Sequence, residues 1–380
     1  MGVILGVIFH FIGGFASGSF YMPYKKVKGW HWESYWIIGG LFSWLIVPPL
    51  AAYLTVPGFA DIISATSFDI IKFTLLFGVL WGIGGLTYGL GVRYLGVSLG
   101  SSIILGLCMV FGSLIPSIYY DLVPKEGKDT FTMLVSSNWG LTVLAGLVVC
   151  IIAIVVCGKA GMMKEKELSS NTTELNAVII KTEYKFALGM FVSIVSGVLS
   201  ACFNFGLEAG ASMANVANEA WKVAHPAQGE FLYRNNVIYV VLLWGGLTTN
   251  FIWCMILNYR NKSFGDYTNK KTPLLRNYIF AALAGTTWFL QFFFYGMGES
   301  KLGNGASSWI LHMAFIILVA NMWGIVSKEW NGVTAKTKKT ITAGIVLIII
   351  SVLIVGRGNA LHKKTENEET KKMSYVLRRS

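Results

Sequence analysis

Charged side chains are scarce in this sequence. Asp, Glu, Lys and Arg together make up only 13% of the 380 residues, whereas an ordinary soluble domain carries roughly 25%. Hydrophobic residues make up 54% of the chain. This composition excludes an ordinary soluble domain and indicates a membrane protein.

Cysteine is also rare, and its spacing indicates no site. All five cysteines fall within long apolar segments, and no two of them form a CxxC pair. The sequence therefore predicts small packing residues, with neither a disulfide framework nor a metal site. These residues are Cys108, Cys150, Cys157, Cys202 and Cys254.

The motifs of nucleotide-driven and catalytic proteins are missing as well. The sequence contains no phosphate-binding loop, no sodium-binding cluster and no paired catalytic carboxylates, which argues against an ATP-driven pump. It also has no nucleophile and base constellation, which argues against a membrane-embedded enzyme. No catalytic residue and no cofactor are predicted. The net charge of +12 does not indicate a nucleic-acid partner, because most basic residues lie in short loops between apolar segments.

Long apolar segments are what the sequence has instead. Each is close to the roughly 20 residues that a helix needs to cross the hydrocarbon core of a bilayer. Because backbone amides in lipid must be hydrogen-bonded within the protein, continuous runs of this length indicate helices. The sequence predicts an all-α membrane protein with ten transmembrane helices, near residues 3–23, 34–54, 71–92, 97–120, 139–157, 186–206, 236–257, 278–298, 306–326 and 340–356.

Basic residues are divided unevenly among the nine loops that connect these segments. The odd-numbered loops hold 18 Lys and Arg residues and the even-numbered loops hold 6. Since loops rich in Lys and Arg stay in the cytoplasm, the odd-numbered loops are predicted to face the cytoplasm and both termini to lie outside. One observation disagrees, because the tail after the last segment holds seven more basic residues.

Two stretches of the sequence resemble each other at a constant offset of 207. Laying "GVLWGIGGLTYGLGVRYLG" (78–96) over "GTTWFLQFFFYGMGESKLG" (285–303) matches seven of nineteen positions, including Trp81 with Trp288. Average composition would give about one or two matches. Weaker similarity continues in the neighbouring segments, so we predict two five-helix repeats. Since five is an odd number, the second repeat would enter the membrane from the opposite face.

These repeats define the predicted organisation of the chain. Residues 1–160 form the first five-helix repeat, 161–185 a cytoplasmic linker, 186–358 the second repeat, and 359–380 a charged, disordered tail. Inverted repeats are frequent in secondary transporters, whose substrate lies near the middle of the membrane between the repeats. The alternative is that glycine and tryptophan merely recur because membrane helices favour them.

Four glycines of the third segment have small-xxx-small spacing, which allows helices to pack closely. They form two pairs, Gly78 with Gly82 and Gly85 with Gly89. We interpret all four as structural.

On the eighth segment a polar amide lies inside an aromatic run. Trp288, Gln291 and Tyr295 are spaced i, i+3 and i+7 and therefore share one helical face. Trp81 and Tyr88 hold equivalent places on the third segment. Aromatic rings that cover the C–H face of a sugar, beside an amide and a phenol that bond its hydroxyls, suit a small neutral polyol. The alternative is that Gln291 only ties two helices together.

The sixth segment adds one more candidate. Its polar face contains serines, which in such stripes usually pack or bond to their own helix, and it also contains Asn204 and Glu208. The predicted substrate-binding residues are Trp81, Tyr88, Asn204, Trp288, Gln291 and Tyr295.

Proton coupling would need a titratable group within reach of this site. Few such groups lie in the segments, and histidine is well suited by its intrinsic pKa. The predicted proton-coupling residues are His10, Glu33 and His312, and Glu208 is a further titratable group. The alternatives are that the histidines are satisfied structural residues and that both glutamates lie at the membrane interface.

At these residues the sequence resembles the L-rhamnose/proton symporter family of the drug/metabolite transporter superfamily. The matching stretches are "FYMPYKKVKGWHWE" (20–33), "WGIGGLTYGLGVRYLG" (81–96), "WFLQFFFYGMG" (288–298), "SWILHM" (308–313) and "KEWN" (328–331). By position, the resemblance extends to His10, Tyr21, Lys25, Lys26, Glu33, Trp81, Tyr88, Arg93, Trp288, Gln291, Tyr295 and His312. Glu208 and the charged tail depart from the family pattern, which leaves an altered substrate or altered coupling open.

The resemblance implies a multi-pass carrier of the bacterial inner membrane that imports a small neutral sugar with protons. We therefore expect L-rhamnose or a similar deoxy sugar as the substrate, protons as the driving ions, and the lipid bilayer as the surroundings. An exporter or exchanger of metabolites or drugs with the same fold, and a sugar sensor that does not transport, remain alternatives. The sequence does not set the oligomeric state.

Overall fold

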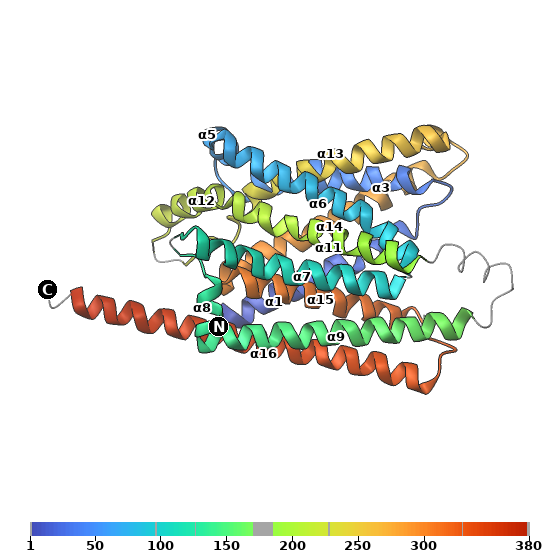
Figure 1. The fold of residues 1–380 in the computed structure, drawn as a ribbon. Coiled ribbons are helices and arrows are strands. Elements are labelled where there is room, and N and C mark those ends of the chain that lie inside the picture. The colour runs from blue at the N-terminus through green and yellow to red at the C-terminus, as the bar shows by residue number, and fades with distance from the viewer. Residues whose placement is uncertain are drawn as a thin grey trace.

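The computed structural model describes residues 2–95, 97–125, 127–169, 185–226, 229–328 and 330–377, and within these ranges it contains helices and no strand (Figure 1). Ten helical stretches in these ranges are long and apolar enough to cross a membrane. Each of the ten predicted segments falls on one of them. The prediction of an all-α, ten-span membrane protein is therefore confirmed.

The spans run side by side along one direction, with the odd-numbered loops at one end and the even-numbered loops at the other (Figure 1). The first five are α1 (Gly2–Ser19) with α2 (Tyr21–Tyr24); α3 (Trp32–Gly40) with the π-helix η1 (Leu41–Ile46) and α4 (Val47–Thr55); α6 (Phe68–Leu95); α7 (Val97–Leu122); and α9 (Asn138–Ser169). The last five are α11 (Phe186–Ala209), α13 (Asn236–Asn261), α14 (Leu274–Leu302), α15 (Gly305–Val326) and α16 (Ala335–Leu377).

Short helices occupy several connections. The even-numbered loops contain α5 (Phe59–Ala65), α8 (Phe131–Ser136) and α12 (Ala211–Ala224), and one odd-numbered loop contains the 3-10 helix η2 (Ser263–Tyr267). In the centre, α1 packs against α14 and α15, while α11 packs against α6 and α7. Helices α9 and α16 form a pair of their own at the side of the bundle.

Glycine lets α6 approach α13 closely. A Cβ atom added at Gly78 would lie 2.0 Å from the carbonyl oxygen of Leu242, and one at Gly82 would also meet the α13 backbone. The structural interpretation of this pair holds. It does not hold for Gly85 and Gly89, because no atom lies within 4 Å of a Cβ added at either. Spacing alone could not tell which glycines face a neighbouring helix.

The π-helical turn η1 lies just ahead of two prolines in the second span. Pro48 and Pro49 have no backbone N–H, so an unbroken α-helix would leave two carbonyl oxygens of the preceding turn without donors. A π turn changes the hydrogen-bond register at this point. Trp44 lies in that turn and is buried.

The last helix, α16, continues through Leu377 and thus covers most of the segment for which the sequence predicts a disordered tail. Its extension is anchored by buried polar contacts. The Ser307 hydroxyl donates to Asn359 Oδ1 at 2.6 Å, and His362 Nε2 lies 3.3 Å from Asp129 Oδ1. The charge pattern of the tail could not reveal these partners, because Ser307 lies on α15 and Asp129 lies in the connection between α7 and α8. At the other predicted connection, α9 extends to Ser169, and residues 170–184 of the linker lie outside the described residues.

Candidate functional site

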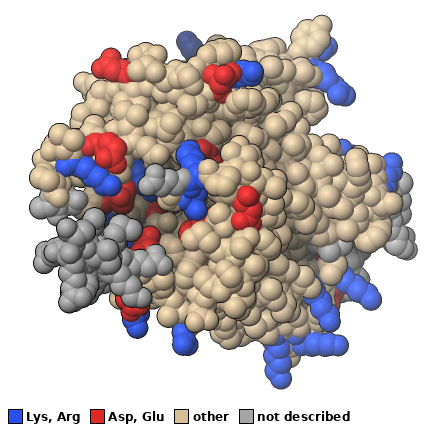
Figure 2. All heavy atoms as spheres, turned by 60° about the vertical axis from the view of Figure 1, so that its left-hand side comes forward, with Lys and Arg blue, Asp and Glu red and all other residues tan. Residues whose placement is uncertain are grey.

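A polar cavity of about 520 Å³ opens at the end of the molecule that carries the even-numbered loops. It lies between α7, α11, α12, α14 and α15. Acidic and basic side chains gather on this end of the molecule in Figure 2. The charged residues that line the cavity are Lys125, Lys128, Asp129, Glu208, Glu219, Lys222, Glu230, Arg234 and Glu299. A cavity with so many hydrogen-bonding groups suits a polar solute.

The inner part of this cavity is formed by Asn204 of α11, which is only 3% exposed. The hydroxyl of Tyr295 on α14 donates to Asn204 Oδ1 over a long distance of 3.5 Å. Tyr295 itself is fully buried. The structure therefore brings two of the predicted substrate-binding residues together directly beneath the cavity.

A proline on α7 explains the orientation of Asn204. Pro116 cannot donate to the carbonyl oxygen four residues earlier, which belongs to Gly112. Asn204 Nδ2 donates to this same oxygen at 2.7 Å. Since an unsatisfied carbonyl in an apolar environment is costly, this bond stabilises the helix pair and also points the Asn204 oxygen toward Tyr295.

Two histidines lie behind Tyr295. The ring centroids of His10 and His312 are 5.3 and 5.1 Å from that of Tyr295, and 6.2 Å from each other. Both imidazoles are fully buried, and neither ring nitrogen of either residue has a hydrogen-bond partner in the described part of the chain. The structure thus brings the predicted pair from the first and ninth spans together in one place.

Deeper in the bundle, the tryptophans of the third and eighth spans meet. The ring centroids of Trp81 and Trp288 are 5.6 Å apart. Trp44 contacts both edge-on, at 6.3 and 5.7 Å. The stacked rings of Phe203 and Phe292, 3.9 Å apart, connect this cluster to the histidines. Sequence reasoning missed Trp44, although the proline pair that follows it signals the π turn that places it here.

The remaining predicted sugar ligands have partners close by in the chain. Gln291 is 4% exposed, and its Nε2 donates to the carbonyl oxygen of Trp288 on its own helix at 2.9 Å. Tyr88 lies toward the odd-numbered end, where its hydroxyl donates to Ser101 of α7 at 2.7 Å. The structure therefore places Gln291 beside the aromatic cluster and Tyr88 apart from Tyr295.

Glu33 is located far from both histidines, at the odd-numbered end. Its Oε1 accepts hydrogen bonds from Asn261 Nδ2 at 2.9 Å and from the Ser263 hydroxyl at 2.6 Å. These bonds join the beginning of α3 to the connection between α13 and α14. We call this pair of hydrogen bonds, from Asn261 and Ser263 to Glu33, the latch. It does not bring Glu33 to the predicted sugar ligands.

Asp266 strengthens the same junction. Its Oδ2 accepts from the backbone N–H of His31 at 2.8 Å and from the Ser34 hydroxyl at 2.8 Å, and lies 2.9 Å from His31 Nδ1. Although burial alone would raise the pKa of Asp266, the hydrogen bonds from His31 and Ser34 lower it below its ordinary value. The carboxylate is therefore held ionised.

The structure shows the hydrogen-bond partners of two glutamates that line the cavity, Glu208 and Glu299. The sequence marked Glu208 as a titratable group and as a departure from the family pattern, and sequence reasoning missed Glu299 altogether. Glu208 Oε2 accepts from the Tyr120 hydroxyl at 2.5 Å and from Lys128 Nζ at 2.6 Å. Glu299 Oε2 accepts from Asn235 Nδ2 at 2.6 Å. The available signal was the spacing of Glu299 from Tyr295, four residues along one helical face.

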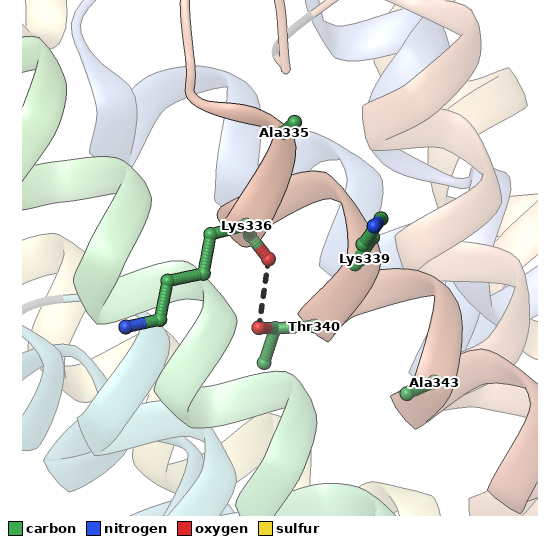
Figure 3. A pocket seen from close by; sticks show the side chains of 5 residues that line it. All are labelled: Ala335, Lys336, Lys339, Thr340 and Ala343. Carbon is green, nitrogen blue, oxygen red and sulfur yellow. Dashed lines mark hydrogen bonds between the residues drawn. The ribbon is translucent and has the colours of Figure 1, made fainter.

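A second hollow, at the beginning of α16, has a different character (Figure 3). Its lining residues all come from this one helix, and the hydrogen bond drawn there runs from the Thr340 hydroxyl to the Lys336 carbonyl oxygen. Polar groups from different elements do not converge on it, so it makes a poor ligand site. The structure also shows no group of metal-ligating side chains among the residues it describes.

Comparison with known proteins identifies relatives along nearly the whole chain. The model of a protein family described as L-rhamnose-proton symport protein (RhaT) matches residues 1–361. The L-rhamnose-proton symporter of Yersinia pestis (strain Pestoides F) is 34% identical over 364 residues, which cover 94% of this chain and 98% of the relative. The L-rhamnose-proton symporter of Shigella dysenteriae serotype 1 (strain Sd197) is 32% identical over 363 residues, with the same coverage of 94% and 98%.

The family match spans every stretch on which the resemblance rested, from "FYMPYKKVKGWHWE" to "KEWN". It also agrees with the ten apolar helices, which make this a multi-pass membrane protein. The family consists of transporters and not of enzymes. The chain belongs to the L-rhamnose-proton symport protein (RhaT) family.

Proposed function

We propose that this protein imports L-rhamnose, or a similar deoxy sugar, together with protons across a bacterial inner membrane. The observation that carries this proposal is the match of relatives named L-rhamnose-proton symporter over 94% of the chain. The polar cavity that leads to Asn204 and Tyr295 supports it, because such a cavity admits a neutral polyol from one face of the membrane. With the odd-numbered loops in the cytoplasm, this face is the outer one.

The sugar would lie between the cavity and the tryptophan cluster. Asn204 and Tyr295 bond its hydroxyls at the cavity side, where their mutual 3.5 Å contact is weak enough to be exchanged for bonds to a ligand. Trp81 and Trp288 cover its apolar face, and Gln291 contributes an amide once it releases the Trp288 carbonyl. Tyr88, held by Ser101, would contact the sugar after the protein opens inward.

The two histidines and Glu33 would each take part in the coupling. The unpartnered ring nitrogens of His10 and His312 provide sites for a proton or a sugar hydroxyl next to Tyr295. Glu33 acts at the cytoplasmic end, where its bonds to Asn261 and Ser263 hold the inner face shut while the outer cavity is open. Breaking this latch is then part of the step that exposes the sugar to the cytoplasm.

The same proposal includes two inverted five-helix repeats, over residues 1–160 and 186–358, in the manner of the drug/metabolite transporter superfamily. Helix partners support it. Under this relation the contact of α1 with α14 corresponds to that of α11 with α6, and the contact of α1 with α15 to that of α11 with α7. The meeting of the equivalent residues Trp81 and Trp288 is a further expected result.

One experiment tests the proposed activity. De-energised cells that express the chain are given L-rhamnose and other sugars while the external pH is recorded. Symport removes protons from the medium, so rhamnose should make it more alkaline, and a protonophore should abolish accumulation of labelled rhamnose. Sugar counterflow without alkalinisation would instead favour an exchanger of the same fold. Binding without flux would favour a sensor.

A second experiment tests the amide. Gln291→Ala is expected to weaken rhamnose uptake while the variant still reaches the membrane in normal amounts. An unchanged apparent affinity would assign Gln291 to helix packing, through its bond to the Trp288 carbonyl.

A further inference from the structure

Two glutamates lie on the cavity wall one helical turn outward from the residues at its inner end. Glu208 follows Asn204 by four residues on α11, and Glu299 follows Tyr295 by four residues on α14. Each carboxylate is therefore about 6 Å further out along its helix. Both line the polar cavity. A solute that enters from this end passes them before it reaches Asn204.

The two carboxylates differ in their partners. Glu208 forms an ion pair with Lys128 at 2.6 Å. Glu299 accepts its hydrogen bond from Asn235, a neutral amide. Arg234 also faces Glu299, but its Nη1 is bound at 2.7 Å to Glu230. The two cations near Glu299, Lys128 and Arg234, are thus each paired with another glutamate.

The other groups that face Glu299 do not compensate a negative charge on it. Glu208 is a second carboxylate in the same cavity and disfavours a further negative charge there. The phenols of Tyr239 and Tyr295 approach Glu299 from α13 and from its own helix, and as neutral groups they supply no positive charge. Both phenol side chains are fully buried. Where two carboxylates share a partly apolar site, protonation of one relieves their repulsion and removes a desolvated charge. Glu299, without an ion pair of its own, is the one to take the proton.

The histidine pair is a second feature that suits proton binding next to the inner end of the cavity. Beyond Tyr295 lie the imidazoles of His10 and His312, fully buried and without hydrogen-bond partners in the described residues. Glu299, Tyr295 and these two rings therefore form a line of titratable or hydroxyl groups that leads from the open end of the cavity into the proposed sugar site.

We propose that Glu299 takes up the transported proton from the outer cavity and releases it on the inner side, a role that rests on the proposed function. Hydronium in the cavity gives its proton to the carboxylate, leaving water and a neutral carboxylic acid. The neutral side chain no longer repels Glu208, so α11 and α14 can close over a sugar bound at Asn204 and Tyr295. After the inner face opens, the proton passes to cytoplasmic water and the carboxylate is restored.

The test compares gradient-driven accumulation with counterflow, in which labelled rhamnose exchanges without a gradient. Glu299→Gln, in the full chain in membrane vesicles, is expected to retain counterflow and lose accumulation. The loss is about 50-fold for one proton at about 100 mV, since that charge movement is worth about 2.3 kcal/mol. The matched control is Glu368→Gln, the same chemical change at a side chain of α16 that is 60% exposed and lies away from this cavity, which should accumulate rhamnose like the parent.

Accumulation by Glu299→Gln equal to that of the parent would overturn the inference. If this variant loses counterflow as well, Glu299→Asp distinguishes the two roles. Shortening a carboxylate that binds the transported proton should shift the pH midpoint of uptake. An unshifted midpoint would show that Glu299 is a structural residue. A parent chain that shows no rhamnose-dependent alkalinisation would contradict the proposed function itself, which is a result distinct from any effect of Glu299.

Discussion

The indole rings of Trp81 and Trp288 lie 5.6 Å apart across the centre of the bundle, inclined by 35°. They come from α6 and α14, at positions that coincide when the two halves of the sequence are aligned. Trp44 closes the group from the second span. Three indoles that meet at mid-membrane provide a broad apolar surface at the inner side of the proposed sugar site.

The first prediction concerns this surface. Trp288→Phe should raise the rhamnose concentration for half-maximal uptake by about three- to tenfold, because a smaller ring covers less of the sugar and weakens the contact by about 1 kcal/mol. Uptake kinetics at matched protein amounts measure this. The control is Trp244→Phe, on an exposed part of α13, which should leave the kinetics unchanged. Equal effects at both positions would argue against a sugar contact at Trp288.

The second prediction concerns the Tyr295 hydroxyl. Tyr295→Phe removes a hydroxyl that is fully buried and makes one long bond to Asn204. The protein should remain folded, because that bond contributes little, while the affinity for rhamnose should fall about two- to tenfold with the lost sugar hydrogen bond. Binding to purified protein, measured by calorimetry, reports the change. Tyr53→Phe, on an exposed side chain of α4, serves as the control.

The third prediction concerns the latch at the odd-numbered end. Glu33→Gln keeps the shape of the side chain but weakens the charge-assisted bonds from Asn261 and Ser263. The inner face should then open more often without sugar. A cysteine introduced at Ala281, which is fully buried near the beginning of α14, should then react faster with a membrane-impermeant maleimide in inside-out vesicles. Unchanged labelling would show that these bonds do not hold the inner face closed.

Much of this arrangement followed from sequence, because it depends on patterns along single helices. The length of the apolar segments predicted the ten spans. The internal similarity of the sequence singled out Trp81 and Trp288, although it could not show that the two rings are in contact. What the sequence could not show was which side chains from different helices converge. Sequence reasoning passed over Glu299 and could not place Glu33 beside Asn261 at the odd-numbered end, because the partners Asn235 and Asn261 come from other segments.

The fourth prediction separates the two glycine pairs of α6. Gly78→Ala would place a Cβ 2.0 Å from the Leu242 carbonyl oxygen, so α6 and α13 must move apart at a cost of about 1–3 kcal/mol or more. The amount of folded protein in the membrane should fall, and its unfolding temperature in detergent with it. Gly89→Ala meets no atom within 4 Å and should be neutral or slightly stabilising, because alanine favours the helix. A loss of stability for Gly89→Ala as large as for Gly78→Ala would contradict this packing.

The last prediction uses pH to probe the junction of α3 with η2. Because hydrogen bonds from His31 and Ser34 lower the pKa of Asp266, its carboxylate binds protons less readily in the folded than in the unfolded state. The stabilisation is therefore fully present above the ordinary Asp pKa of about 4 and is lost as pH falls through the lower folded value.

At pH 7, Asp266→Asn should lower the unfolding temperature in detergent by about 2–6 °C. The difference from the parent should shrink below about pH 4, where the parent carboxyl also becomes neutral. Asp69→Asn, at a side chain that is 79% exposed, should show no such difference at either pH. A deficit of Asp266→Asn that stayed constant down to about pH 3 would mean that the shape of the side chain, and not its charge, supports the junction.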